Sequence, residues 1–188
     1  MELKITLLYK LIMETKKMST NRNNMKKKKL KIQNIYTESI LSRPIIIDIN
    51  DIDDNIKKTL EAKLVKMIEG KCTCEGFVKP DSCKIISYSS GLVKNGNQIK
   101  FEVLFKCKIC LPIEGMLIDC VAKNITKAGI KAEIDEDITP IIVFIARDHH
   151  YSNENFSSVN ENDKITVRVI GQKFELNDTY ISVIASLT

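Results

Sequence analysis

Six cysteines and two histidines are the residues of this sequence whose types could hold a metal ion. The cysteines include a C-x-C pair, Cys72 and Cys74, and a C-x-x-C pair, Cys107 and Cys110. Structural zinc is bound by four Cys or His side chains, usually as two close pairs on turns where the ligand atoms converge. A zinc site therefore requires that the two sulfurs of a pair point the same way.

The surroundings of the C-x-x-C pair favour a strand over a zinc-binding turn. In QIKFEVLFKCKIC (residues 98–110) apolar and polar residues alternate, which predicts a β-strand. Because side chains alternate between the two faces of a strand, Cys107 shares a face with Phe105 and Cys110 points to the other. Cys72 and Cys74 would share a face but lack a clear second pair. Since free cysteine behaves as a small, often buried apolar residue, we predict core cysteines and no metal site.

Motifs for catalysis are equally scarce. The sequence has no Gly-rich phosphate loop, no G-x-S-x-G and no H-E-x-x-H. The acidic run DINDIDDN (residues 48–55) resembles a Mg²⁺-binding segment, but carboxylates also favour the positive N-terminal end of a helix. No spacing supports a nucleophilic site built from Cys120 or Ser152 with a histidine. The sequence therefore predicts neither an enzyme nor a bound cofactor.

The elements that position these residues begin with one clear helix near residues 50–70. Its apolar residues recur at helical spacing on one face: Ile52, Ile56, Leu60, Leu64 and Met67 or Ile68. We expect Asn50 to cap its N-terminus, with Asp51 and Asp54 close to the positive end of the helix dipole. Gly70 is placed to end it as the residue after the C-cap.

The remaining segments are short, rich in β-branched residues and separated by turns such as Asn95–Asn97. Residues 30–49 suggest one or two strands, broken at Ser42–Pro44. About five short strands follow Gly115, which suits an OB-type barrel. We predict an α+β N-terminal domain, a helix on a small antiparallel sheet, at residues 30–111. An all-β OB-fold barrel follows at residues 112–188.

Charge is distributed unevenly along the chain. The net charge is +5, but residues 1–31 hold ten Lys/Arg against two Glu, which leaves −3 on the rest. Residues 1–29 therefore read as a basic, disordered tail, either solvated, binding phosphate or acting as a nuclear import signal. Nucleic acid must contact this tail or a local patch. Without a secretory signal or an apolar run of about 20 residues, we expect an intracellular, reducing compartment.

Several segments, taken in order, resemble one protein family. They are IYTESILSRPIIIDI with the helix after it, an EG-x-C-T strand at residues 69–73, a P-x-x-G at residues 112–115, VFIARDH at residues 143–149 and VRVIGQKFELNDTYISVIASL at residues 167–187. Their collinear order resembles the stalk subunit of multisubunit DNA-dependent RNA polymerases, which is the seventh subunit of eukaryotic RNA polymerase II and has an archaeal counterpart. The resemblance covers roughly residues 32–187. The unmatched basic tail and the short loop at residues 148–161 suggest a divergent member, for example from a large DNA virus.

The resemblance implies a non-catalytic subunit acting in transcription. The first domain would dock at the base of the polymerase clamp, and the OB domain would guide nascent single-stranded RNA. Partners would be the large core subunits and a smaller stalk subunit, in the nucleus or, for a virus, in the cytoplasmic virus factory and the virion. The expected docking residues come from a loop at residues 41–45 and from residues 71–79: Ser42, Arg43, Pro44, Glu75, Gly76 and Phe77. Phe77 could instead pack in the core, as Cys72 is expected to do.

For RNA, the resemblance draws attention to PIIVFIA (residues 140–146). Alternation places Ile141, Val143 and Ile145 inside the barrel and Phe144 outside. OB domains of this type often present an aromatic residue or His to a base at that place, although Phe144 could also pack on the first domain. Phosphate contacts are expected from basic side chains around it: Lys123, Lys127, Lys131, Arg147 and His149. Such binding should tolerate sequence and depend strongly on salt.

A second interpretation is a free-standing OB-fold RNA-binding factor in translation or RNA processing. Such a factor has no need for the helix and the EG-x-C-T strand of the first domain. It should also carry positive charge on its fold rather than only in its tail. The first domain therefore favours the polymerase subunit.

Overall fold

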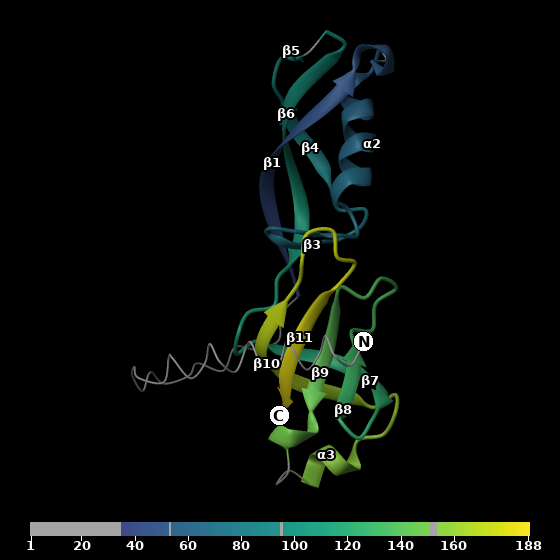
Figure 1. Cartoon of the computed structure of the whole chain (residues 1–188), viewed down its shortest axis with the longest axis vertical. Helices are drawn as coiled ribbons and strands as arrows, with labels where there is room; N and C mark the ends of the chain where they lie inside the picture. Colours follow the sequence, from purple (N-terminus) through teal and green to yellow (C-terminus); the bar gives the residue numbers. More distant parts are fainter. Residues whose placement is uncertain (1–34, 53, 95, 151–153) are drawn as a thin grey trace, which may run out of the picture.

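The computed structural model describes residues 35–188 except 53, 95 and 151–153, and these residues form two stacked parts (Figure 1). The first part, here the sheet unit, contains β1 (Tyr36–Asp48), η1 (Ile49–Asp51), α2 (Ile56–Ile68), β2 (Cys72–Thr73), β3 (Gly76–Val78), β4 (Lys84–Tyr88), β5 (Leu92–Lys94) and β6 (Gln98–Cys110). The second part, the barrel, contains β7 (Leu117–Ile125), β8 (Gly129–Glu133), β9 (Ile141–Ala146), η2 (Arg147–His149), α3 (Glu154–Ser158), β10 (Lys164–Lys173) and β11 (Ile181–Leu187). The predicted fold class is confirmed. The predicted tail at residues 1–29 lies outside the described residues.

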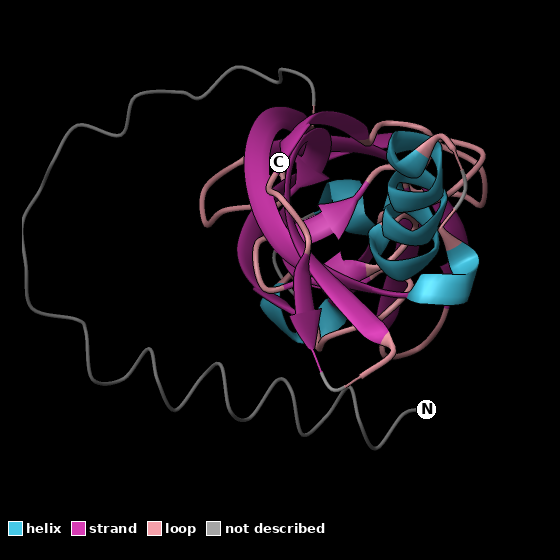
Figure 2. Ribbon diagram, turned by 90° about the horizontal axis from the view of Figure 1, so that it is seen from above, coloured by secondary structure: helices cyan, strands magenta, loops and turns pink. Residues whose placement is uncertain are grey.

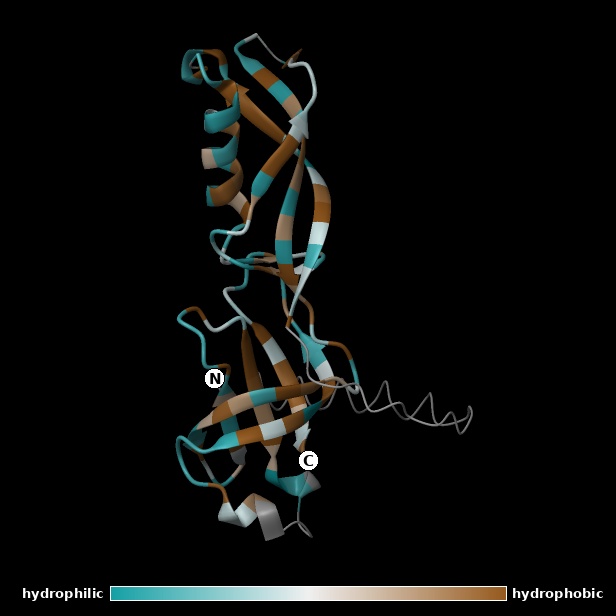
Figure 3. Cartoon of the chain, turned by 180° about the vertical axis from the view of Figure 1, so that it is seen from behind, coloured by the Kyte–Doolittle hydropathy of each residue, from teal (hydrophilic) through white to brown (hydrophobic). Residues whose placement is uncertain are grey.

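Strand β6 is the central strand of the sheet unit. It pairs antiparallel with β1 along its whole length on one side, and with β5, β4 and β3 in turn on the other. Apolar and polar residues alternate along the long strands (Figure 3). One face of β6 packs against α2 through buried side chains: Phe101, Val103, Phe105, Cys107 and Ile109. This confirms the strand predicted at residues 98–110.

Strand β1 corrects the prediction of a loop at residues 41–45. It runs unbroken through Ser42, Arg43 and Pro44, and Pro44 pairs with Glu102. Proline has no N–H to donate, so it is tolerated in a strand only at an edge or a bulge. The order β1-β6-β3-β2 puts β1 at an edge, which explains how the strand continues through Pro44.

Helix α2 begins later than the cap predicted at Asn50. Its N-cap is Asn55, whose side-chain oxygen accepts a hydrogen bond of 3.2 Å from the Lys58 N–H. Asn50 instead lies in the 3-10 turn η1, and no acidic residue lies in the first turn of α2. The predicted apolar face is correct for Leu60, Leu64 and Ile68, which are buried, whereas Ile52 lies before the helix. The helix ends at Ile68 with Glu69 as its C-cap, and Gly70 follows the cap as predicted, with φ +70°.

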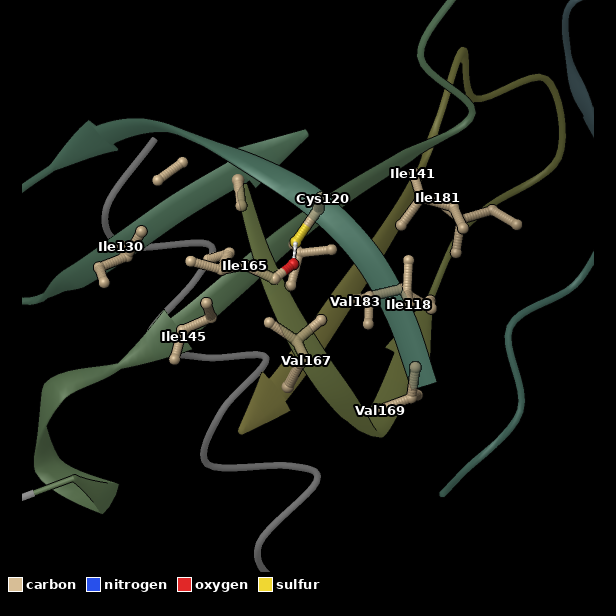
Figure 4. Close-up of a cluster of buried hydrophobic side chains, with 14 of the residues drawn as sticks. Ile118, Cys120, Ile130, Ile141, Ile145, Ile165, Val167, Val169, Ile181 and Val183 are labelled. Carbon is tan, nitrogen blue, oxygen red and sulfur yellow. Dashed lines mark hydrogen bonds between the residues drawn. The ribbon is translucent and has the colours of Figure 1, made fainter. Parts of the chain in front are cut away.

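The barrel closes in the order β7-β8-β9-β11-β10, with β10 paired back to β7. The β9–β11 pair is parallel and the other pairs are antiparallel, which is consistent with an OB fold. Side chains from all five strands fill the interior (Figure 4), among them Ile118, Ile130, Ile145, Val167 and Val183. On β9, Ile141, Val143 and Ile145 are buried as predicted.

The two parts share a hydrophobic core where they meet. Tyr36, Cys72, Phe77 and Cys110 of the sheet unit pack in one cluster with the interior of the barrel. The β10–β11 loop adds backbone bonds at the same place, because the Cys72 N–H donates to the Asp178 carbonyl at 2.7 Å. Viewed along the long axis, the sheet unit and α2 stack over the barrel (Figure 2). The boundary at residues 111–112 falls between β6 and β7 and stays a prediction.

Candidate interaction surfaces

Four of the six cysteines, Cys72, Cys107, Cys110 and Cys120, are buried, and the six do not converge on one point. Cys107 belongs to the core of the sheet unit and Cys110 to the shared core, on opposite faces of β6 as predicted. Cys72 is buried, whereas Cys74 is exposed, so these two do not share an environment. Burial raises the pKa of Cys110 to about 12 and, with the nearby Asp178 charge, that of Cys72 to about 11. Both thiols therefore stay protonated near neutral pH. Metals bind the thiolate form, which these two cysteines do not adopt at that pH.

Among the described residues, no group of three or more Cys, His, Asp or Glu side chains lies in an arrangement that could hold a metal ion. All six cysteines are free thiols. No helix in the described part of the chain has the length and apolar content to span a bilayer.

Two of the six predicted docking residues meet in an ion pair. The Arg43 Nη2 atom donates to Glu75 Oε1 at 2.6 Å and to Glu75 Oε2 at 2.5 Å, and it also lies 3.4 Å from the Cys74 sulfur. Burial alone would raise the pKa of Glu75, but hydrogen bonds from Arg43, Cys74 and Thr73 outweigh it and lower the pKa to about 2. The pair joins β1 to the β2–β3 turn.

Gly76 and Phe77 are buried, which corrects their assignment to a docking surface. Phe77 has no exposed surface and packs in the shared core, the alternative left open by the sequence. Gly76 has φ +127°, and a Cβ there would lie 2.5 Å from the Cys110 carbonyl oxygen. Glycine is therefore required for β3 to approach β6 so closely. Both residues are buried within the chain near the junction of the two parts.

The remaining docking candidates lie on different faces of the sheet. Ser42 and Pro44 are exposed, and strand alternation turns them away from the face that carries Arg43. The six predicted residues therefore do not form one surface.

Exposed apolar side chains gather at the end of the sheet unit that is farthest from the barrel, which is seen in Figure 1 as the end with β5. Leu92 and Val93 on β5 are 65% and 71% exposed, and Ile46 and Ile49 are also exposed. Ile46 and Leu92 flank Lys100 across the sheet, since both pair with it. We call these four apolar residues the distal surface, which extends over both faces of this end of the sheet, because Leu92 and Val93 are neighbours on one strand. The sequence missed it because strand alternation alone does not show that β5 lies beyond the reach of α2.

The predicted RNA-binding residues converge on the β7–β8–β9 part of the barrel. Phe144 is half-buried on the outer face, opposite Lys131 on β8 and Ile184 on β11. Lys131 points outward as predicted, because Ile130 and Ala132 are buried. Its Nζ lies 2.8 Å from Glu133 Oε1, which partly neutralises its charge.

The other basic residues surround the β7–β8 turn. Arg147 holds this turn, since its N–H donates to the Ala128 carbonyl at 3.0 Å and its Nη2 to the Thr126 carbonyl at 3.3 Å. Lys127 is exposed at the turn, and Lys123 is exposed where β7 shifts its register against β8. The side chain of His149 lies outside the described residues.

His150 is a structural residue that sequence reasoning did not identify. Its Nδ1 lies 2.8 Å from the Ala146 carbonyl oxygen, and its Nε2 accepts from the Leu187 N–H at 3.0 Å. The ring also stacks on Phe156, with centroids 5.1 Å apart. These partners fix a neutral ring with its proton on Nδ1. The ring therefore ties the end of β11 to α3.

Comparison with known proteins finds similar sequences that include three RNA polymerase subunits, and no family model matches the chain. The mimivirus protein "Putative DNA-directed RNA polymerase subunit L376" (Acanthamoeba polyphaga mimivirus) is 25% identical over 82% of this chain and 83% of its own length. DNA-directed RNA polymerase II subunit 7 of Arabidopsis thaliana is 30% identical over 50% of this chain and 51% of its own length. Subunit RPB7 of Glycine max is 20% identical over 67% of this chain and 78% of its own length.

Proposed function

Because this chain is homologous over most of its length to RPB7 stalk subunits and to the mimivirus protein, we propose that it is a non-catalytic stalk subunit of a DNA-directed RNA polymerase. The family predicted from the sequence is thereby confirmed, and the chain is an RNA polymerase II subunit 7-like protein. One structural observation supports the proposal in addition to the sequence similarity. A sheet unit and an OB-like barrel share one core, so the first part holds the second in a fixed position.

The distal surface is the part of the sheet unit that we propose for docking on the large polymerase subunits. Its four residues expose apolar area at the end opposite the barrel, where burial would be favourable by about 25 cal/mol per Å². Docking there would leave the barrel projecting from the enzyme. A smaller stalk subunit is the further partner of this proposal.

The outer face of β8 and β9 is the surface that we propose for nascent RNA. Strands 2 and 3 of an OB fold and the adjoining loops commonly bind oligonucleotides, and β8 and β9 are the second and third barrel strands. Phe144 can stack on a base, and Lys123, Lys127 and Arg147 add positive charge around the β7–β8 turn. The subunit would then act inside the cell, in the nucleus or in a virus factory.

Affinity purification tests the proposed function directly. The full chain carrying a tag at its C-terminus should recover the large polymerase subunits from cells in which it is expressed with its polymerase. Replacing Leu92 and Val93 by Ser should abolish that recovery, while the same double change at Val65 and Met67, exposed on α2, should not. Recovery of the chain alone, or with ribosomes, would contradict the proposal and favour the free-standing RNA-binding factor.

A further inference from the structure

A cavity of about 290 Å³ on the sheet unit is lined by four lysines, none of which belongs to the barrel face described above. The lysines are Lys79, Lys84, Lys106 and Lys108, and the carboxylates that line it are Glu38 and Asp81. The lining thus carries two more positive than negative charges. The cluster could not be predicted from the sequence, because the lysines come from separate segments: β4, β6 and the loop before β4.

The arrangement of the lysines is electrostatically unfavourable in the absence of an anion. Lys84 and Lys106 are directly opposite each other across the β4–β6 pair, and like charges at such positions destabilise a sheet. Lys108 follows Lys106 on the same face of β6. Two of the four lysines are compensated: Lys106 by Glu38 at 2.9 Å, and Lys79 by Glu136, which is not part of the lining, at 3.4 Å. No ion pair joins Lys84 or Lys108 to a carboxylate in the described part of the chain.

The backbone around the cavity is held in place. The Lys79 N–H donates to the Lys108 carbonyl at 2.9 Å, and the Lys108 N–H donates to Ser82 Oγ at 3.2 Å. Glu69 fixes the same loop by accepting from the Asp81 and Cys83 N–H groups at 2.9 and 2.8 Å. The lysine side chains therefore extend from backbone that hydrogen bonds hold in place, and not from an unconstrained loop.

We propose that this lysine cavity binds phosphate groups of single-stranded RNA, as a second contact separate from the barrel face. Lysine binds phosphate as a point charge, and the lining contains no aromatic ring on which a base could stack. Contact with the backbone alone makes the site independent of sequence. The choice of RNA as ligand rests on the proposed function, whereas the anion site itself rests on the cavity.

Lysine footprinting on the full chain tests the proposal. Acylation of each lysine by an N-hydroxysuccinimide ester is measured by mass spectrometry with and without oligouridylate. Lys84 and Lys108 should be protected by RNA, while Lys57 and Lys58, exposed on α2, should not. Inorganic pyrophosphate at high concentration should protect the same pair if the site reads phosphate. Equal protection by polyglutamate at matched charge would overturn the proposal and favour an acidic protein partner.

Binding measurements on variants complete the test. The double change Lys84→Gln with Lys108→Gln should lower the slope of log affinity against log salt by about 1.4, since each phosphate contact on a single strand contributes about 0.7. The matched control, Lys57→Gln with Lys58→Gln, should leave the slope unchanged. If the wild-type chain binds RNA and both variants keep its slope, the cavity is not a phosphate site and the barrel proposal stands. If the wild-type chain binds no RNA, the RNA-guiding role fails as well, and protection by pyrophosphate then reports on the cavity alone.

Discussion

Arg43 and Glu75 form a close ion pair between separate segments of the sheet unit, although they are 32 positions apart in the chain. A carboxylate that accepts two bonds from one guanidinium is held in a single orientation. Both side chains are about 30% exposed, so solvent screens the attraction, and a stabilisation of about 1 kcal/mol is reasonable. At this scale the pair fixes the β2–β3 turn against β1.

The first prediction concerns the pH dependence of this pair. The pKa of Glu75 falls from its ordinary 4.5 to about 2 on folding, so its contribution is fully present above pH 4.5 and is lost as pH falls toward 2. Urea unfolding of Arg43→Ala should show a loss of about 1 kcal/mol near neutral pH and almost none near pH 2. Glu102→Gln, at an exposed pair with Lys100, is the control and should have little effect at either pH. An effect of Arg43→Ala that does not change with pH would show that packing, not charge, is responsible.

The second prediction concerns the barrel face. Phe144→Ala combined with Lys131→Ala should weaken binding of single-stranded RNA at low salt, because one stacked base is worth about 1–3 kcal/mol. Recovery of the large polymerase subunits should stay unchanged. Ile142→Ala removes an apolar side chain from the same outer face of β9 and should leave RNA affinity close to wild type. Unchanged affinity in the Phe144 variant, measured by filter binding, would rule out this face.

At the scale of elements, helix α2 shows how one misplaced cap alters a prediction. Asn50 and Asn55 are both suitable cap residues by type, and only the Asn55 side chain meets an N–H of the helix. Asn55→Ala should therefore lower the free energy of unfolding by about 1 kcal/mol. Asn50→Ala, in the 3-10 turn η1, should cost much less. Thermal melts followed by circular dichroism distinguish the two, and equal losses would contradict the observed cap.

Periodicity explains which elements could be predicted from the sequence. Alternation at residues 98–110 and 141–145 depends only on the geometry of one strand, so it correctly placed Cys107, Cys110 and the interior of β9. The strand break predicted at Pro44 was wrong because a strand tolerates proline at an edge, and the edge position of β1 is a property of the assembled sheet. Alternation could not predict the burial of Phe77, because its side chain packs in a core shared with the barrel.

The lysine cavity and the Arg43–Glu75 pair were beyond prediction for the same reason. Both depend on the register of β6 with its neighbours, and register joins residues that are far apart in the chain. The residues predicted to bind RNA lie near one another because they are close in sequence, on β7, β8 and β9, and their role stays a prediction.

At the scale of the whole molecule, the junction decides whether the sheet unit and the barrel behave as one body. Beside the shared core, Tyr36 Oη donates to Glu136 Oε2 at 3.2 Å, and Lys79 Nζ lies 4.3 Å from the centroid of the Tyr36 ring. Burial and the Glu136 charge both raise the pKa of Tyr36, so its hydroxyl keeps the proton that it donates. These contacts come from β1, the loop after β3 and the β8–β9 loop. Such rigidity would keep the proposed RNA face at a fixed distance from the proposed docking surface.

The last prediction tests that rigidity through Phe77, the largest side chain of the sheet unit in the shared core with no exposed surface. Phe77→Ala should cost about 3–5 kcal/mol and separate the unfolding of the two parts, because the side chain joins them. Hydrogen exchange in urea should show the wild-type sheet unit and barrel opening together, and should show two separate transitions in the variant. Phe101→Ala removes the same ring from the core of the sheet unit away from the barrel, so it should lower stability while one transition remains. A single transition in Phe77→Ala would mean that the hydrogen bonds of Cys72 and Tyr36 are enough to couple the parts, and that docking and RNA binding are linked through them rather than through the packed core.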